Sequence, residues 1–522
     1  MVNRFFRLMV TVFVLTAFMA LAPAAGMCTT SSSGPVAQPD FDQMDRYIQD
    51  MMRDCRIPGF SVSIVHDGEL LYAKGYGKAD DTGRAVTPQT PFLIGSVSKT
   101  FTALAVMQLA QDGKLNLDAP VRDYLPDFWL ADTKASAEIT VRQLLNHTSG
   151  IAEGAEFSVA SLRGDDETIH QLVGKFGSIA PKYRPGARFE YGNANYIVLG
   201  ELIQVVSGMT YEDYVQTHIF APLEMNHSYT SAQAAGTDGL AVGYRSIFGY
   251  PQASGLPYRK DFLPAYSIIS CAEDMAHYMT AMLHGGRYNG TSVLTEEGVA
   301  QMMQASSAIS KWVSYGLGWY VTSGSAYHGG ELPDYQAKVK LLPQDSLAVA
   351  LMYNTSSSTA AELFNVGYRD KIETGIINVL YGVPPTEQPG QNPMDLNSYP
   401  MPLTYGILLG LVILAAILLA LSVWRLKSLR RRLTKSSFAF WRIVTLSTLL
   451  NVVLPLAILF DIPAKAKASW AYVLYYVPDV GWFALVSSVL LLLLGCAKGA
   501  LIFKQLLHKN TTVPHPNPSR VP

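Results

Sequence analysis

The chain has 522 residues, long enough for more than one domain, and a formal net charge of −1. A charge so close to zero gives no indication of nucleic-acid binding, which needs a basic surface against the phosphates. Hydrophobic residues make up 49% of the chain, a high fraction for a soluble protein, and the excess lies at the two ends. We therefore expect membrane-directed segments at the ends and no nucleic-acid partner.

Residues 1–25 have the layout of a secretory signal peptide. Two arginines precede an apolar core over residues 8–21, and small residues follow at 22–24, where a signal peptidase would cleave. An uncleaved anchor is the alternative, although the apolar core is short for a full span. A lipoprotein with a lipid on Cys28 is a further alternative, but Met27 is a poor fit before a lipidated cysteine.

Residues 38–382 alternate between strand-like and helix-like patterns. Asp67-Gly68 marks the turn of one hairpin, and residues 343–346 mark the turn of another. Strands at both ends with helices between them predict an α/β (α+β) domain, in which an antiparallel sheet is flanked by helices and accompanied by a helical subdomain. The expected strands cover residues 60–65, 69–75, 315–321, 336–342 and 347–353, and the expected helices cover residues 41–53, 100–111, 139–145, 195–206, 272–283 and 360–380.

Ser96 lies between an apolar run and the helix expected from residue 100, whose apolar residues fall on one face. The unpaired N–H groups and the dipole of a helix N-terminus favour negative charge that develops there. Lys99 follows one turn later, and a desolvated lysine can remove the proton of a serine hydroxyl. Alone, a Ser-x-x-Lys motif is more often an N-cap serine followed by a solvated lysine.

Two further motifs follow in the same domain. Tyr191-Gly192-Asn193 supplies a phenol that can relay a proton and an amide that can hold a lysine or a substrate. His328-Gly329-Gly330 precedes Glu331 and is expected to open a glycine-rich edge strand, where a backbone N–H can serve as an oxyanion donor. Either motif alone is an ordinary turn or loop, but the three in this order are hard to obtain by chance.

The four cysteines and ten histidines form no pattern typical of metal ligands, such as CxxC or HExxH. We therefore expect no metal site and no cofactor. Cys55 and Cys271 could pair in an exported domain, but the sequence leaves that open.

The C-terminal part of the chain reads as a membrane segment behind a linker over residues 383–402. Six basic residues directly follow the first apolar run, which places that loop in the cytoplasm. We therefore expect a cell-membrane, multi-pass protein whose domain lies outside the cell, with the lipid bilayer as a partner. A transport unit is the alternative, but the few charges lie near the span ends. The expected spans cover residues 403–424, 443–460 and 473–497 within the segment 403–503, and residues 504–522 form a cytoplasmic tail.

The three motifs resemble those of the serine β-lactamase and penicillin-binding protein superfamily, and the Tyr-x-Asn form resembles the class C branch. The runs over residues 113–120, 144–150 and 220–225 also resemble that branch. The resemblance covers about residues 40–380 and implies a β-lactamase/transpeptidase-like fold. It does not cover the membrane segment.

The resemblance implies an acyl-enzyme mechanism. Ser96 would attack a carbonyl, Lys99 and Tyr191 would share the base and acid roles, and Asn193 would orient Lys99 and the substrate. The backbone N–H groups of Ser96 and Glu331 would form the oxyanion hole.

The third motif points to a sub-class. His328 stands where many members have lysine, which is similar to certain DD-carboxypeptidases, D-aminopeptidases and esterases. Gly329 replaces a threonine that helps hold the substrate carboxylate in lactamases and DD-peptidases, and a missing donor of this kind costs about 1.5–3 kcal/mol. We therefore expect a serine hydrolase for a peptide, amide or ester, with cell-wall D-amino-acid peptides as the leading substrates. A weak β-lactamase and a penicillin-binding sensor or pseudoenzyme are the alternatives, and the oligomeric state stays open.

Overall fold

The computed structural model describes residues 39–161, 167–247, 250–356, 368–385 and 449–466, with short stretches between 470 and 496. The expected signal peptide and the first expected span lie outside these residues, and the other two spans are described only in part. No helix in the described part of the chain is both long and apolar enough to cross a bilayer. The membrane segment and the cytoplasmic tail therefore stay predictions.

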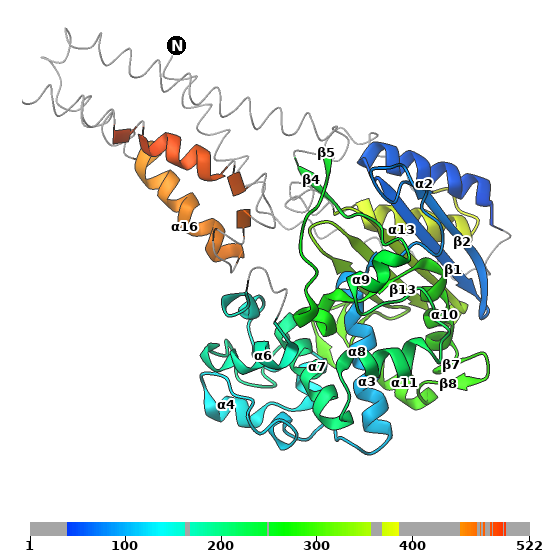
Figure 1. Ribbon diagram of the computed structural model, residues 1–522, viewed down its shortest axis with the longest axis horizontal. Helices are drawn as coiled ribbons and strands as arrows, with labels where there is room; N and C mark the ends of the chain where they lie inside the picture. Colours follow the sequence, from blue (N-terminus) through cyan, green and yellow to red (C-terminus); the bar gives the residue numbers. More distant parts are fainter. Residues whose placement is uncertain are drawn as a thin grey trace, which may run out of the picture.

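An eight-stranded antiparallel sheet forms the centre of the domain, in the order β2-β1-β14-β13-β12-β11-β10-β9 (Figure 1). β1 (Gly59–His66) and β2 (Glu69–Gly77) make the predicted hairpin, with Asp67 and Gly68 at positive φ in its turn. β1 also pairs with β14 (Leu347–Tyr353), so the two ends of the domain meet within the sheet.

The prediction of a single strand over residues 315–321 is wrong. The segment divides into β10 (Ser314–Tyr315) and β11 (Tyr320–Val321), because Gly318, with a φ of 85°, turns the chain between them. β13 (Gln336–Leu342) matches its expected bounds, as β14 does.

β12 (Ala326–Glu331) pairs with β13 along its whole length. Its pairing with β11 is confined to Ala326 and Tyr327. The prediction of an edge strand is therefore wrong, because β12 lies between β13 and β11, although β11 pairs only with its first two residues, and the strand begins two residues before the histidine.

Helices cover both faces of the sheet. α2 (Phe41–Cys55) and α13 (Tyr368–Leu380) pack side by side on one face, where their apolar residues share a core with β1 and β14 (Figure 1). α10 (Ala272–Leu283) lies on the other face, with the bounds that the sequence predicted. The last helix was expected from residue 360, but residues 357–367 lie outside the described part.

α3 (Ser98–Gln111) runs between the sheet and the helical subdomain. The prediction that this helix buries only one apolar face is wrong, because every residue from Ser98 to Leu109 is buried. α7 (Asn193–Ser207) packs against α3 from the subdomain side and ends at Gly208, which has a left-handed conformation. The start of α3 is therefore enclosed on all sides by protein, and this sets the electrostatics of Lys99.

The remaining described α-helices and strands are short, apart from α16. They are α4 (Thr133–Glu138), α5 (Val141–Leu145), α6 (Ile169–Gly174), α8 (Tyr211–Val215), α9 (Ala232–Thr237), α11 (Glu296–Met302), α16 (Leu454–Ala466), β3 (Phe92–Leu93), β4 (Tyr244–Ile247), β5 (Tyr250–Ala253), β6 (Ile269–Ser270), β7 (Arg287–Tyr288), β8 (Thr291–Ser292) and β9 (Ser307–Ala308).

Candidate active site

Ser96 lies in a single 3₁₀ turn, Gly95–Val97, directly before α3. Gly95 has a φ of 54°, and a Cβ on it would lie 2.6 Å from the backbone nitrogen of Glu331. Only glycine fits here, because any side chain would push β12 away from the turn. The Ser96 side chain is half-buried, so its hydroxyl can meet a substrate.

Lys99 is completely buried and its Nζ lies 3.1 Å from Oγ of Ser96. The same Nζ lies 2.7 Å from Oδ1 of Asn193 and 2.8 Å from the carbonyl oxygen of Ala265. Both of these oxygens can only accept, so a neutral Lys99 amine gives them its two hydrogens and turns its lone pair toward Ser96. Burial lowers the pKa of Lys99 to about 7, although the charge of Glu156 acts in the opposite direction.

Tyr191 is the second proton-carrying group at Ser96. Its ring lies 4.9 Å from Nζ of Lys99. Burial raises the pKa of Tyr191 well above its ordinary value, and a hydrogen bond with Ser96 offsets part of that rise. Tyr191 is therefore a neutral phenol at neutral pH, which suits it to donate a proton, while the Lys99 amine suits the role of the base.

Asn193 is the first residue of α7, and its amide bridges two buried charged groups. Its Oδ1 accepts from Lys99, and its Nδ2 donates to Oε1 of Glu156 over 3.0 Å. Glu156 lies in a 3₁₀ turn, Ala155–Ser158, and is completely buried. The sequence analysis missed Glu156, because it belongs to no motif and reaches the site only through the fold.

His328 is almost completely buried on β12, on the side of the site that faces Tyr191. Its Nδ1 lies 2.8 Å from the carbonyl oxygen of Gly329, which can only accept, so Nδ1 carries a proton. Its Nε2 lies 3.0 Å from the hydroxyl of Tyr315, which donates to it in the neutral ring. The motif histidine is thus held in one orientation at the wall of the site.

The two backbone segments that the resemblance assigns to an oxyanion hole, at Ser96 and at Glu331, lie close together. A Cβ on Gly330 would lie 1.9 Å from the carbonyl oxygen of Ile94 and 3.1 Å from the backbone nitrogen of Ser96. β12 therefore approaches the Ser96 turn backbone to backbone, which brings the N–H of Glu331 next to the N–H of Ser96. Two such donors are what an oxyanion requires.

His147, in the run over residues 144–150, is also brought to the site, although the sequence assigned it no role. It is completely buried and has a φ of 59°. Its Nδ1 accepts from the backbone N–H of Gly192 over 3.3 Å, and its ring lies 4.5 Å from the ring of Tyr191. Burial lowers the pKa of His147 well below its ordinary value, so the ring is neutral.

A cavity of about 400 Å³ has Tyr266 and Leu332 in its wall. These two residues directly follow Ala265 and Glu331 in the chain, but none of the residues predicted for the site lines the cavity itself. Asp334 also lines the cavity, and burial raises the pKa of its carboxyl to about 6.

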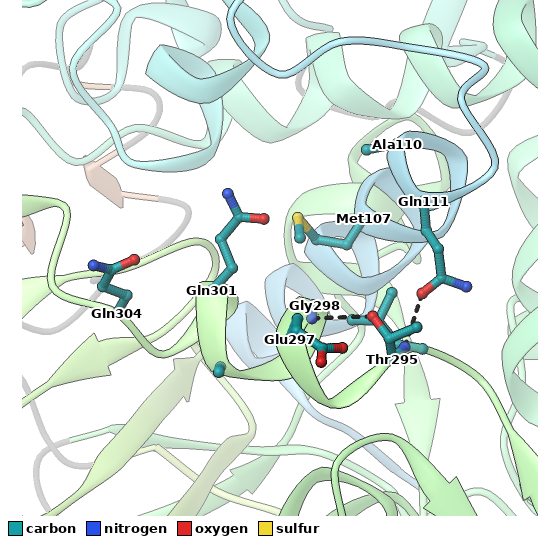
Figure 2. Close-up of a pocket in the computed structure, with 10 residues that line it drawn as sticks. Met107, Ala110, Gln111, Thr295, Glu297, Gly298, Gln301 and Gln304 are labelled. Carbon is teal, nitrogen blue, oxygen red and sulfur yellow. Dashed lines mark hydrogen bonds between the residues drawn. The ribbon is translucent and has the colours of Figure 1, made fainter.

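A larger open hollow of about 850 Å³ lies at the far end of α3 from Ser96 (Figure 2). Met107 and Gln111 line it from α3, and Gln301 faces them from α11. None of the residues predicted for the site lines this hollow, so we do not assign the chemistry to it.

Among the residues that the structure describes, no three His, Cys, Asp or Glu side chains are arranged to hold a metal ion. Cys55 and Cys271, whose pairing the sequence left open, are both free thiols.

Comparison with known proteins places these residues in a family. The beta-lactamase family profile matches residues 44–371. Protein flp of Staphylococcus aureus (strain NCTC 8325 / PS 47) is 27% identical over 461 residues, covering 86% of this chain and 88% of that protein. Penicillin-binding protein 4 of Amycolatopsis lactamdurans is 27% identical, covering 67% of this chain and 93% of that protein.

Among solved structures, the octameric penicillin-binding protein homologue from Pyrococcus abyssi is similar, with a TM-score of 0.58 and 27% identity. That match covers 67% of this chain and 80% of the other. The chain therefore belongs to the beta-lactamase family, within the superfamily of serine β-lactamases and penicillin-binding proteins.

Proposed function

We propose that the protein is a serine hydrolase that forms an acyl-enzyme on Ser96 and acts on an ester or on a peptide or amide. One observation carries the proposal: Lys99 is buried, has a pKa of about 7 and lies with Nζ 3.1 Å from Oγ of Ser96. Burial of a lysine does not by itself stabilise the fold, because burying its ammonium form costs free energy. A functional role of the neutral amine explains why Lys99 is buried with a pKa of about 7.

The chemistry divides between the groups around Ser96. Oγ of Ser96 attacks the substrate carbonyl carbon while its proton moves to Nζ of Lys99, and the N–H groups of Ser96 and Glu331 bind the oxyanion. When the bond to the leaving group breaks, Tyr191 donates its proton to the departing oxygen or nitrogen and regains one from Lys99. Water then attacks the acyl-enzyme in the reverse sense, which releases the acid and restores the Ser96 hydroxyl.

We propose cell-wall D-amino-acid peptides, or esters of comparable size, as substrates. The similarity to penicillin-binding protein 4 of Amycolatopsis lactamdurans supports the peptides. Gly329 supports the esters, since no threonine hydroxyl stands there for a substrate carboxylate, and peptides that end in a free carboxylate should therefore bind weakly. β-Lactam hydrolysis is for the same reason a weak activity at best.

We further propose that the domain works outside the cell, tethered by the apolar C-terminal segments. The uncharged run over residues 403–424 and the basic residues that follow it support this arrangement. The match with protein flp covers 86% of the 522 residues, which is more than residues 1–382 contain. The similarity therefore extends past residue 382 into part of the C-terminal region.

A penicillin-binding sensor is the second candidate, and the similarity to penicillin-binding protein 4 of Amycolatopsis lactamdurans favours it. Both functions begin with acylation of Ser96, so only the fate of the acyl-enzyme separates them. A hydrolase releases the acyl group within a turnover, whereas a sensor retains it.

The test uses the full chain in its membrane or in detergent. A fluorophosphonate probe for serine hydrolases should label the protein, and Ser96→Ala should remove the label while thermal unfolding stays unchanged. A panel of small esters and a fluorescent penicillin, followed for acylation and release, then identifies the substrate class. Labelling that persists in the Ser96→Ala protein contradicts the assignment of the nucleophile.

A further inference from the structure

Glu156 has no role in the three motifs, yet it is the buried carboxylate that faces the catalytic lysine. It lies in the turn Ala155–Ser158, on a segment more than thirty residues before α7 in the chain, and is completely buried at the start of that helix. Burial raises the pKa of Glu156, and the backbone N–H of Glu156, the Asn193 amide and the Lys99 charge counteract the rise.

The Asn193 amide connects Glu156 to Lys99 with a fixed polarity. The Glu156 carboxylate accepts from Nδ2 over 3.0 Å, so the amide oxygen must face the other way, where it accepts from Lys99 over 2.7 Å. A rotated amide would direct its N–H groups at Lys99 and its oxygen at the Glu156 carboxylate, and both hydrogen bonds would be lost. Glu156 therefore determines which end of the amide the lysine meets.

Glu156 also acts on Lys99 through its charge. The negative charge of Glu156 raises the pKa of Lys99, against the larger effect of burial. The other titratable groups that face Lys99 are the rings of Tyr191 and Tyr196, both with raised pKa values, and the neutral ring of His147. None of these carries a negative charge at neutral pH, so the electrostatic counterpart of Lys99 is Glu156.

We propose that Glu156 is a positioning residue of this active site, which orients the Asn193 amide and supplies the negative charge that balances Lys99 while it holds the Ser96 proton. The inference rests on the proposed function, because it assigns Lys99 the role of the base. Glu156 touches neither the substrate nor the reacting atoms and acts through Asn193 and Lys99.

Two variants of the full chain separate the two roles of Glu156. Glu156→Gln keeps an oxygen for Nδ2 of Asn193 but removes the charge, so Lys99 should lose its proton more easily. The rise of the labelling rate with pH should shift to lower pH by about one unit, with the plateau within roughly threefold of the wild type. Glu156→Ala removes both roles, and its plateau should fall at least about tenfold in addition.

Glu201→Gln is the matched control. Glu201 is also buried and lies on α7, but it pairs with His170 over 2.7 Å and not with the Lys99 network. This variant should leave the pH profile in place. Thermal unfolding of all three variants shows whether a lower maximal labelling rate comes from loss of the fold. The pH at which the labelling rate of Glu156→Gln rises decides the inference, whatever the maximal rate is.

A second measurement does not depend on activity. The titration of Lys99 can be followed by NMR in a chain that carries ¹³C at the lysine Cε, with the resonance assigned by its loss in Lys99→Arg. Glu156→Gln should lower the observed pKa, and Glu201→Gln should not. An unlabelled wild-type protein contradicts the proposed function, whereas an unchanged Lys99 titration in Glu156→Gln overturns the inference about Glu156.

Discussion

The ring of His147 packs 4.5 Å from the ring of Tyr191, and its Nδ1 accepts the N–H of Gly192, the next residue along. The amide of Asn195 donates to the same Nδ1 over 3.1 Å. Because two donors occupy Nδ1, the proton of the neutral ring sits on Nε2. His147 therefore holds the backbone next to Tyr191 and packs against the ring that we propose relays the proton.

We expect His147→Asn to slow fluorophosphonate labelling by about tenfold or more, since a misplaced general acid loses much of its contribution. Asparagine tolerates the left-handed backbone of this position, so the fold should survive. His218→Asn is the control, because His218 stacks on Tyr214 at 4.2 Å in a place remote from the motifs. Equal labelling by both variants would show that the Tyr191 contact is structural only.

The second prediction concerns pH. Lys99 accepts the Ser96 proton only in its neutral form, and its pKa is about 7. The labelling rate should therefore fall roughly tenfold for each pH unit below 7 and level off at higher pH. Lys99→Arg should remove labelling at every pH, because arginine stays protonated. A rise centred near pH 10 would contradict the lowered pKa of Lys99, and labelling that persists in Lys99→Arg would mean that Lys99 is not the base.

The third prediction concerns the side of the membrane on which the domain lies. In a chain whose four native cysteines are replaced by serine, a single cysteine at Gln388 should react with a membrane-impermeant thiol reagent on whole cells. A cysteine at Thr434, within the basic loop, should react only after lysis. The opposite pattern places the hydrolase domain inside and removes cell-wall peptide as a substrate.

The fourth prediction concerns Gly329. Gly329→Thr adds a hydroxyl where related enzymes grip a carboxylate, so acylation by penicillin should improve relative to a neutral ester by about 10- to 100-fold. If Gly329 instead provides backbone freedom, threonine should impair both substrates alike. Equal loss on both substrates, or fast penicillin hydrolysis by the wild-type protein, would contradict our interpretation of this position.

The local parts of this structure follow from the sequence. Ser96 and Lys99 are one helical turn apart, and Tyr191 precedes a well-patterned helix, so the motifs locate them without a fold. Glu156 could not be found this way, because its contact with Asn193 joins two segments with no shared pattern. The burial of Lys99 was likewise hidden, since it depends on α7 and the sheet enclosing α3 from both sides.

A glycine also explains why the predicted strand over residues 315–321 differs from the structure. The segment over residues 315–321 alternates like one strand, but Gly318 at positive φ reverses the chain inside it. At Gly330 the missing Cβ matters for a different reason: the motif predicted room for substrate backbone, whereas the structure places Gly330 against the backbone of Ile94 and Ser96.

The pairing of β1 with β14 has a consequence for the order of assembly. Phe60 lies opposite Tyr353 in this pair, so β1 can pair with β2 early in synthesis but finds its second neighbour only when the domain is nearly complete. β12, which carries His328 and the proposed oxyanion donor Glu331, pairs with β13, and β13 pairs with β14. A nascent or truncated chain that stops before Leu347 should therefore have Ser96 and Lys99 at the start of α3 but lack the strand that supports Glu331, and we expect it to be inactive until its last strand is in place.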